Sequence, residues 1–206
     1  MAARRSDPET RGRVIDAAVA CILELGFYRA SSNEIARRAG VTWGVIQHYF
    51  GTREALLLAV LHDGARRFTE LVGGATIDGG TQEERIAQLI DLLASHYGQP
   101  EYLAYLQILL NLEHDPRTSD EVRATMDEVA RASYEHVRRL LRETLGPRSP
   151  DLATTVFLTL RGFVVSQQLL DAMAYDMVAP QHDRVARQRS LLAAVLAPAL
   201  ESASKP

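Results

Sequence analysis

The stretch that decides the fold is EIARRAGVTWGVIQHYFGTREALL, residues 34 to 57. A helical pattern stops at Gly40, restarts after Thr42 and stops again before Gly51. Glycine commonly ends helices and a threonine hydroxyl is a suitable N-cap, so this spacing predicts two helices joined by a turn of about four residues.

The two faces of the short second helix differ in chemistry. Helical spacing puts one set of side chains on an outer face that stays unburied, Trp43, Gly44, Gln47 and His48. Val41, Ile46 and Phe50 turn toward the preceding helix. This pattern is typical of a helix-turn-helix that reads the major groove of DNA. An ordinary helical hairpin that exposes these residues without a function is the alternative.

The rest of the chain also follows a helical pattern. Ala, Leu, Arg and Glu dominate, and no run of β-branched alternation appears, which predicts an all-α fold. A first helix is expected from Asp7 to Gly26, and a second after Ser31, which forms a capping-box pattern with Glu34. Later helices are expected from Thr52 to the Gly73-Gly74 pair and over about 81–97, 100–114, 119–145, 151–175 and 182–200.

Charge is distributed unevenly along the 206 residues. The net charge is −3, but residues 1–53 carry eight arginines against five acidic residues, and the remainder carries fifteen basic against twenty-one acidic residues. A basic N-terminal part suits contact with a polyanion. Arg4, Arg5, Arg11 and Arg13 are candidates for added phosphate contacts, or for a solvated tail.

Several classes of protein are not expected. The longest apolar run, Ala55 to Leu61, is too short to span a membrane, and no secretory pattern is seen, so a cytoplasmic protein without membrane contact is predicted. The single cysteine, Cys21, is expected in the core. The six histidines have no zinc spacing, and no phosphate loop or nucleophile motif appears. No enzyme, cofactor or metal is therefore expected.

The segment GFYRASSNEIARRAGVTWGVIQHYFGTREALL resembles the N-terminal signature of the TetR family of prokaryotic transcriptional regulators. The positions that fit it are Gly26, Ile35, Ala36, Ala39, Gly40, Val41, Gly44, Ile46, Tyr49, Phe50 and Leu56 or Leu57. The resemblance implies a three-helix helix-turn-helix DNA-binding domain over residues 1–53. A long fourth helix would join it to a helical ligand-binding and dimerisation bundle over residues 54–206.

The resemblance also implies which residues bind DNA. Ser31 and Ser32 would touch phosphate at the start of the second helix, and Asn33 would follow them at the groove edge. Thr42 and Tyr49 would also reach phosphates. Arg53 stands where the family has lysine and would keep its charge. Bases would face Trp43, Gly44, Val45 and His48.

Two positions depart from the family pattern. Gln47 replaces a common tyrosine and has the groups to pair with adenine. The ring of Trp43 is expected to pack on the sugar-phosphate backbone, with contact to a thymine methyl group as the alternative.

The C-terminal helices are implied to bind a small-molecule effector and a second subunit. Surplus apolar residues in LATTVFLTLRGFVVSQQLL (152–170) and LLAAVLAPAL (191–200) suggest a homodimer through the last two helices. Arg161 needs a partner from the ligand, the second subunit or its own bundle. Candidate ligand residues are Tyr102, Tyr105, Gln107, Asn111, His114, Tyr134, Arg161, Gln167, Gln168 and Met173.

The function implied is a dimeric repressor that an effector releases from a near-palindromic, double-stranded DNA operator. The alternative is a helical ligand-binding or scaffold protein whose DNA module is non-specific or architectural. Equal binding of a palindrome and a random duplex across a salt series would favour this alternative.

Overall fold

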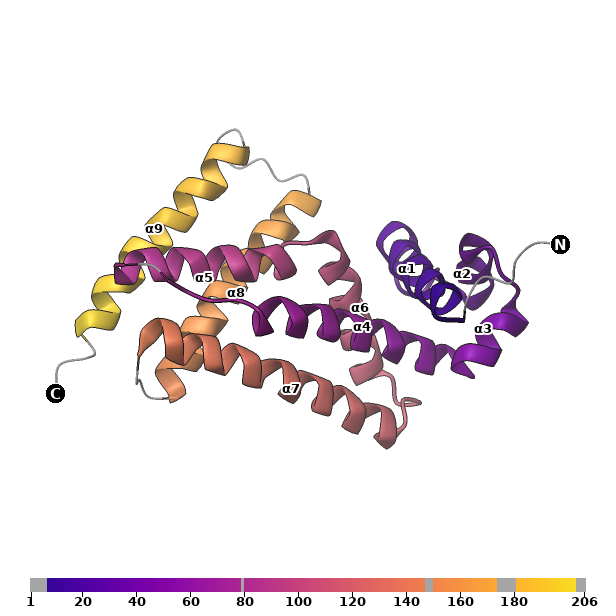
Figure 1. The fold of residues 1–206 in the computed structure, drawn as a ribbon. Coiled ribbons are helices and arrows are strands. Elements are labelled where there is room, and N and C mark those ends of the chain that lie inside the picture. Colours follow the sequence, from indigo (N-terminus) through magenta and orange to yellow (C-terminus); the bar gives the residue numbers. More distant parts are fainter. Residues whose placement is uncertain (1–6, 79, 147–149, 174–180, 203–206) are drawn as a thin grey trace. The chain divides into compact units, whose positions relative to one another are not determined.

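A computed structural model describes residues 7–78, 80–146, 150–173 and 181–202. Within these ranges the regular structure is entirely helical, which confirms the predicted all-α class (Figure 1). The helices are α1 (Asp7–Leu25), α2 (Ser32–Ala39), α3 (Trp43–Phe50), α4 (Arg53–Gly73), α5 (Gln82–Tyr97), α6 (Pro100–His114), α7 (Asp120–Leu145), α8 (Pro150–Ala172) and α9 (Gln181–Ser202).

Local sequence signals explain the starts of three helices, α2, α4 and α5. The Ser31 hydroxyl accepts a hydrogen bond from the Glu34 amide at the start of α2, and the Thr52 hydroxyl accepts one from the Ala55 amide at the start of α4. Thr81 and Glu84 form a complete capping box at the start of α5. Each of these bonds satisfies a backbone donor that the first helical turn leaves without a partner.

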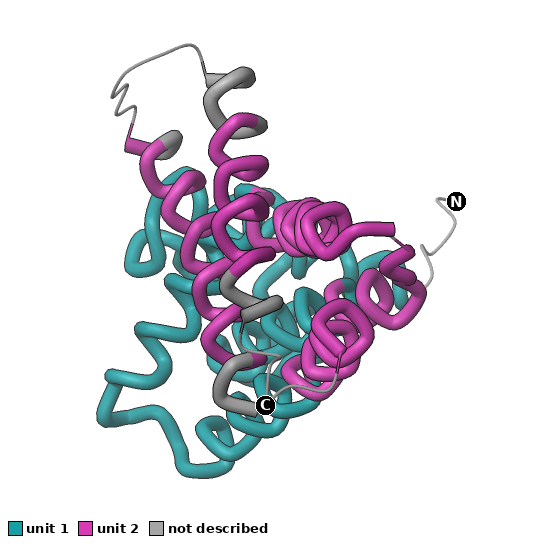
Figure 2. The backbone as a smooth tube through the Cα atoms, turned by 90° about the vertical axis from the view of Figure 1, so that its left-hand side faces the viewer, with its two compact units in different colours: residues 1–67, 100–132 teal, residues 68–99, 133–206 magenta. Residues whose placement is uncertain are grey.

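The chain divides into two compact units, shown in teal and magenta in Figure 2. Unit 1 contains residues 1–67 and 100–132, and unit 2 contains residues 68–99 and 133–206. The division therefore falls inside α4 and inside α7. It differs from the predicted boundary at residues 53 and 54, because α6 and half of α7 pack with the N-terminal helices; that functional boundary stays a prediction.

Unit 1 has one hydrophobic core, to which α1 contributes most. Helix α1 packs against α2 and α6, and α2 packs against α3. Cys21 is fully buried, as the sequence predicts, and burial raises the pKa of its thiol. Buried side chains from α1, α2, α3, α4 and α6 include Val14, Ile22, Ile35, Ile46, Leu56 and Ile108. This core positions α2 and α3.

Unit 2 is built around α5, which packs against both α8 and α9. The apolar face of α5 is buried along its whole length, from Ile86 to Tyr97. Arg85 of α5 donates hydrogen bonds to the Thr144 carbonyl in α7, and Arg139 donates to the Val72 carbonyl in α4. Long polar side chains thus link α5 to α7 and α7 to the end of α4 within unit 2.

Candidate nucleic-acid interface

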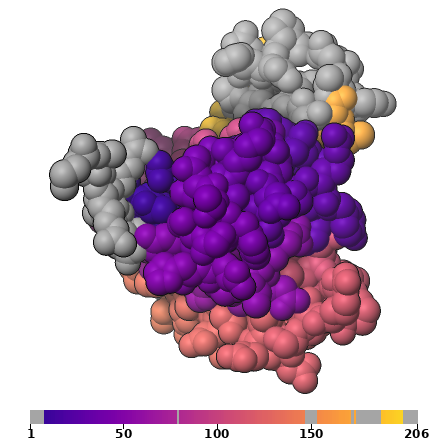
Figure 3. Space-filling model, turned by 90° about the vertical axis from the view of Figure 1, so that its right-hand side faces the viewer, coloured from indigo at the N-terminus to yellow at the C-terminus, as the bar shows by residue number. Residues whose placement is uncertain are grey.

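The turn between α2 and α3 has the geometry that the sequence predicts. Gly40 has a φ of 66°, in the left-handed region that glycine occupies without strain. Its amide donates to the carbonyls of Ala36 and Arg37, and the Val41 amide donates to Ala36. These bonds end α2 and start α3 three residues later in a defined direction. Figure 3 shows the surface over these N-terminal helices in indigo and purple.

The start of α2 presents its polar residues unequally. Ser31 and Asn33 are exposed, and Ser32 is half-buried. The second half of the predicted capping box does not form: the Glu34 carboxylate accepts hydrogen bonds from Arg37 and Arg38. Sequence spacing alone could not show this, because two guanidinium groups compete with one backbone amide for the same carboxylate.

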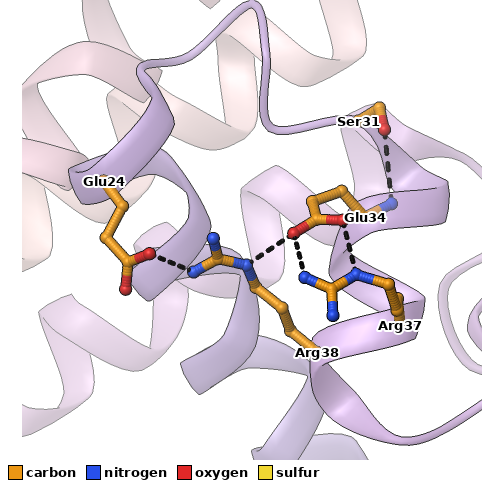
Figure 4. Close-up of polar contacts among 5 residues, drawn as sticks. All are labelled: Glu24, Ser31, Glu34, Arg37 and Arg38. Carbon is orange, nitrogen blue, oxygen red and sulfur yellow. Dashed lines mark hydrogen bonds and ion pairs between the residues drawn. The ribbon is translucent and has the colours of Figure 1, made fainter.

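An ion-pair cluster connects α2 to α1 (Figure 4). Glu34 contacts Arg37 at 2.6 Å and Arg38 at 2.8 Å, and Arg38 reaches Glu24 of α1 at 2.7 Å. The hydrogen bonds from Arg37 and then from Arg38 lower the pKa of Glu34 to about 2. Both arginines are therefore paired within the protein.

Helix α3 leaves most of its outer face open. Gly44, Gln47 and His48 are exposed, and Val45 and Tyr49 are half-buried. Ile46 is fully buried, and Val41 and Phe50 pack against the core, as predicted. The tips of Gln47 and His48 therefore lie where a base edge could approach them.

Two residues at the start of α3 differ from expectation. The ring of Trp43 is half-buried and packs against the core of unit 1, so it does not project freely beside Gln47. The Thr42 hydroxyl makes no cap hydrogen bond, and the prediction of a hydroxyl cap is wrong. The Thr42 carbonyl instead accepts from the amides of Val45 and Ile46. A phosphate contact from Thr42 stays a prediction.

The Arg53 side chain is half-buried and makes contacts within unit 1, and its phosphate contact stays a prediction. Its guanidinium donates to the Phe27 carbonyl at 2.9 Å and the Ala30 carbonyl at 3.5 Å, and it lies 4.6 Å from the centre of the Phe27 ring. Burial lowers the pKa of Arg53. Lysine could not make the same set of contacts, because it lacks a planar group with several donors.

The N-terminal arginines are only partly described. The guanidinium of Arg11 lies over the Phe50 ring, 5.4 Å from its centre. Arg13 is half-buried on α1. Arg4 and Arg5 lie outside the described residues. Their phosphate contacts stay a prediction.

The candidate ligand residues divide between the two units. Tyr102, Tyr105, Gln107, Asn111 and His114 lie on α6 in unit 1. Tyr102 is buried, and the Asn111 amide group donates to the Gln107 carbonyl. The Gln107 side-chain oxygen accepts from the Phe27 amide at 3.2 Å, and His114 is exposed.

The other five candidates lie in unit 2. The Tyr134 and Thr154 hydroxyl groups are 2.6 Å apart, and Gln167 donates to Gln188 at 2.9 Å. Gln168 is buried and donates to the Gln99 carbonyl. Met173 is exposed.

Arg161 lies over an aromatic ring in unit 2. Its guanidinium is 5.3 Å from the centre of the Tyr97 ring, beside His96. Burial, and then the charge of Arg161, lowers the pKa of His96 to about 4, so this imidazole is neutral at physiological pH. His96 is not among the site residues predicted from the sequence; it lies in the last turn of α5, next to the buried Tyr97.

Exposed apolar side chains gather on the last two helices. Leu158 and Leu169 of α8, and Leu191 and Val195 of α9, are exposed. Large exposed apolar groups are common where a protein meets another surface.

The described part of the chain holds neither a candidate metal site nor a candidate membrane-spanning helix. No group of three or more His, Cys, Asp or Glu residues there is arranged to hold a metal ion. None of the described helices has the length and hydropathy needed to cross a membrane.

The N-terminal helices match a known family. Residues 14–60 match the family model described as bacterial regulatory proteins, tetR family. The chain is 35% identical over 83 residues to the HTH-type transcriptional regulator BetI of Escherichia coli O17:K52:H18, which covers 39% of this chain and 43% of that protein. It is 27% identical over 133 residues to BetI of Brucella canis, covering 64% of this chain and 65% of that protein. The matches thus span less than two thirds of either relative.

One similar solved structure covers nearly the whole fold. The transcriptional regulator FadR from Bacillus subtilis, in complex with stearoyl-CoA, has a TM-score of 0.62 at 20% identity. The match covers 94% of this chain and 97% of that chain. At this identity the likeness shows a shared fold, and the ligand belongs to that protein.

Proposed function

We propose that the chain is a regulator of the tetR family and, more specifically, a dimeric repressor that a small-molecule effector releases from a near-palindromic operator; the family match over residues 14–60 and the similarity to BetI support this. The observation that carries the proposal is the open face of α3, where Gly44, Gln47 and His48 are exposed while Ile46 anchors the helix. A recognition helix needs this division between an anchor and a reading face.

The dimer rests on the exposed apolar residues of α8 and α9. Leu158, Leu169, Leu191 and Val195 would be covered by the same helices of a second copy. A two-fold dimer offers two copies of α3, which explains why a near-palindromic operator belongs to the proposal. Replacing Leu191 and Val195 with Glu is expected to yield a monomer in light scattering. A variant that remains dimeric would contradict this interface.

The effector is the least specific part of the proposal. The fold is shared with a regulator that was crystallised with stearoyl-CoA, which supports an effector bound by the C-terminal helices here. Such an effector must bind the released conformation more tightly, by about 1.4 kcal/mol for each tenfold loss of operator affinity. A thermal-shift screen of small molecules, followed by DNA binding with each hit, tests this part.

The experiment that tests the function is selection of duplexes from a random library, followed by a salt series. Wild-type protein is expected to enrich a near-palindrome and to bind it more tightly than a scrambled duplex at each salt concentration. Replacing both Gln47 and His48 with Ala should remove the preference but keep the salt-dependent, non-specific binding. If wild-type protein binds both duplexes equally, the DNA module is non-specific or architectural and the proposed function fails.

A further inference from the structure

The turn between α1 and α2, residues 26–31, decides where α2 begins. Gly26 has a φ of 81° and its carbonyl accepts from the Ala30 amide. Ser31 ends the turn and caps α2 through the Glu34 amide. A displacement of the turn therefore shifts the cap, and with it the first turn of α2.

Helix α6 contacts this turn from a distant part of the sequence. The side-chain oxygen of Gln107 accepts a hydrogen bond from the Phe27 amide at 3.2 Å, and both residues belong to unit 1. Phe27 lies directly after Gly26, whose amide donates to the Ile22 carbonyl at the end of α1. Removing the Gln107 oxygen leaves the half-buried Phe27 amide without this hydrogen bond. The free-energy cost is larger than for an exposed amide, which water could satisfy.

Helix α4 contacts the same residue from its first position. Arg53 donates to the Phe27 carbonyl, stacks on the Phe27 ring and reaches the Ala30 carbonyl. The amide, the carbonyl and the ring of Phe27 are thus each held by a side chain from another helix.

We propose that Gln107 and Arg53 are positioning residues, which hold the α1–α2 turn so that α2 and α3 present the reading face correctly. The proposal rests on the DNA-binding function proposed above and adds two side chains, one from α6 and one from α4, that hold the turn at the start of α2. Gln107 acts through Phe27 and Ser31 and touches neither DNA nor effector in this role.

The path from the turn to the reading face is continuous. Ser31 caps α2, and the Gly40 and Val41 amides tie the start of α3 to the carbonyls at the end of α2. A movement of α6 that breaks the Gln107 bond therefore alters the support of both helices. This link couples α6 to the reading face of α3 only if α6 has two positions of similar free energy, one with the Gln107 bond and one without it.

The test compares three variants of the full chain. Gln107→Leu removes the acceptor at similar size, and Gln107→Glu restores an acceptor oxygen. Gln88→Leu is the matched control, because the Gln88 side-chain oxygen also accepts a backbone amide, that of Asp78 at 3.1 Å, but in unit 2. Affinity is measured for the duplex that wild-type protein enriches and for a scrambled duplex, below the melting range of every variant.

We expect Gln107→Leu to bind the enriched duplex about tenfold more weakly, equal to about 1.4 kcal/mol, with unchanged affinity for the scrambled duplex. Gln107→Glu and Gln88→Leu should stay within about twofold of wild type. If Gln107 only stabilised the fold, Gln107→Leu would lower the melting temperature without changing the ratio of the affinities for the enriched and the scrambled duplex. Wild-type affinity in Gln107→Leu, or an equal loss in Gln88→Leu, overturns the proposal.

Hydrogen exchange supplies a readout that does not need DNA. In Gln107→Leu the amides of Ala30 and Glu34 should exchange faster than in wild type, and Gln107→Glu should restore their protection. If wild-type protein enriches no duplex, the proposed function fails, and exchange still decides whether Gln107 holds the turn. Unchanged exchange at both amides overturns that role.

Arg53 gives an independent check by a double-mutant cycle. Arg53→Lys keeps the charge but loses the planar group that donates to the carbonyl while stacking on Phe27. Because both residues act on Phe27, Gln107→Leu should cost much less affinity in the Arg53→Lys background than in wild type. Additive losses would mean that the two side chains act separately, against the proposal.

Discussion

Helices α2 and α3 are neighbours of equal length, eight residues each, but they use their polar side chains in opposite ways. The charged residues of α2 pair with one another and with α1, and three of its side chains are buried. Helix α3 has one buried side chain, Ile46, and leaves Gln47 and His48 exposed. The first helix is thus fixed by its own chain, and the second keeps its hydrogen-bonding groups available for a ligand as large as DNA.

The largest expected effect comes from the single anchor of α3. Ile46→Ala should lower the free energy of unfolding by about 2–5 kcal/mol, because a fully buried side chain leaves a cavity. Urea denaturation measures this loss. Hydrogen exchange should show α3 unprotected in Ile46→Ala, whereas Ile35→Ala should leave α2 protected by its other buried residues and ion pairs. If each variant lost exchange protection in its own helix, α2 and α3 would not differ in how firmly they are anchored.

The next effect concerns reading of DNA. Gln47→Ala should reduce discrimination at one base pair of the operator by about 1–3 kcal/mol, because a glutamine that pairs with a base edge is lost. Duplex selection with the variant protein measures the base preference at each position. Arg37→Ala in α2 serves as the comparison and should alter no base preference, since its guanidinium is paired with Glu34. An altered preference in Arg37→Ala would show that α2 also reads bases.

A smaller effect separates the two helix caps. Ser31→Ala should cost about 1 kcal/mol of stability, because its hydroxyl accepts the Glu34 amide. Thr42→Ala should change stability by less than about 0.5 kcal/mol, since its hydroxyl makes no cap bond. Thermal unfolding of both variants tests the pair. Equal losses would mean that Thr42 caps α3 in solution.

The smallest effect is a pH dependence confined to α2. The pKa of Glu34 is lowered from its usual 4.5 to about 2, so its pairing stabilises the fold above that usual pKa. This contribution is lost as the pH falls from 4.5 towards about 2, when the carboxylate takes up a proton. The melting temperature of Glu34→Gln should therefore approach that of wild type as the solution is acidified. A constant difference would show that Glu34 acts through packing.

The fold was largely predictable, because the signals that begin and end helices are local. Ser31, Gly40 and Thr52 each act on a backbone group within four residues, and the helices end within a few residues of the expected positions. Thr42 shows the limit of this reasoning. Its residue type and position suit a cap, but the backbone carbonyl of the same residue supplies the helix-starting bonds without the hydroxyl.

The sequence predicted which face of α3 is exposed, but not what the side chains at the edge of that face contact. Periodicity correctly separated the buried Ile46 from the exposed Gln47 and His48. It could not show that the Trp43 ring packs against the core, because a residue at the edge of a helix face can turn to either side. The DNA contacts themselves, and the ligand roles of residues on α6 and in unit 2, stay predictions.

The sequence by itself determined the all-α class, the approximate helix ends and the face of α3 that remains open, because each depends on spacing along one short segment. Tertiary structure alone decided the partners of the long side chains that reach another helix or a distant turn. Arg53 and Gln107 lie 54 residues apart in the chain, and they meet at Phe27 only because α4 and α6 belong to the same unit. A long side chain has several positions within reach, and the helix packed beside it decides which one it takes.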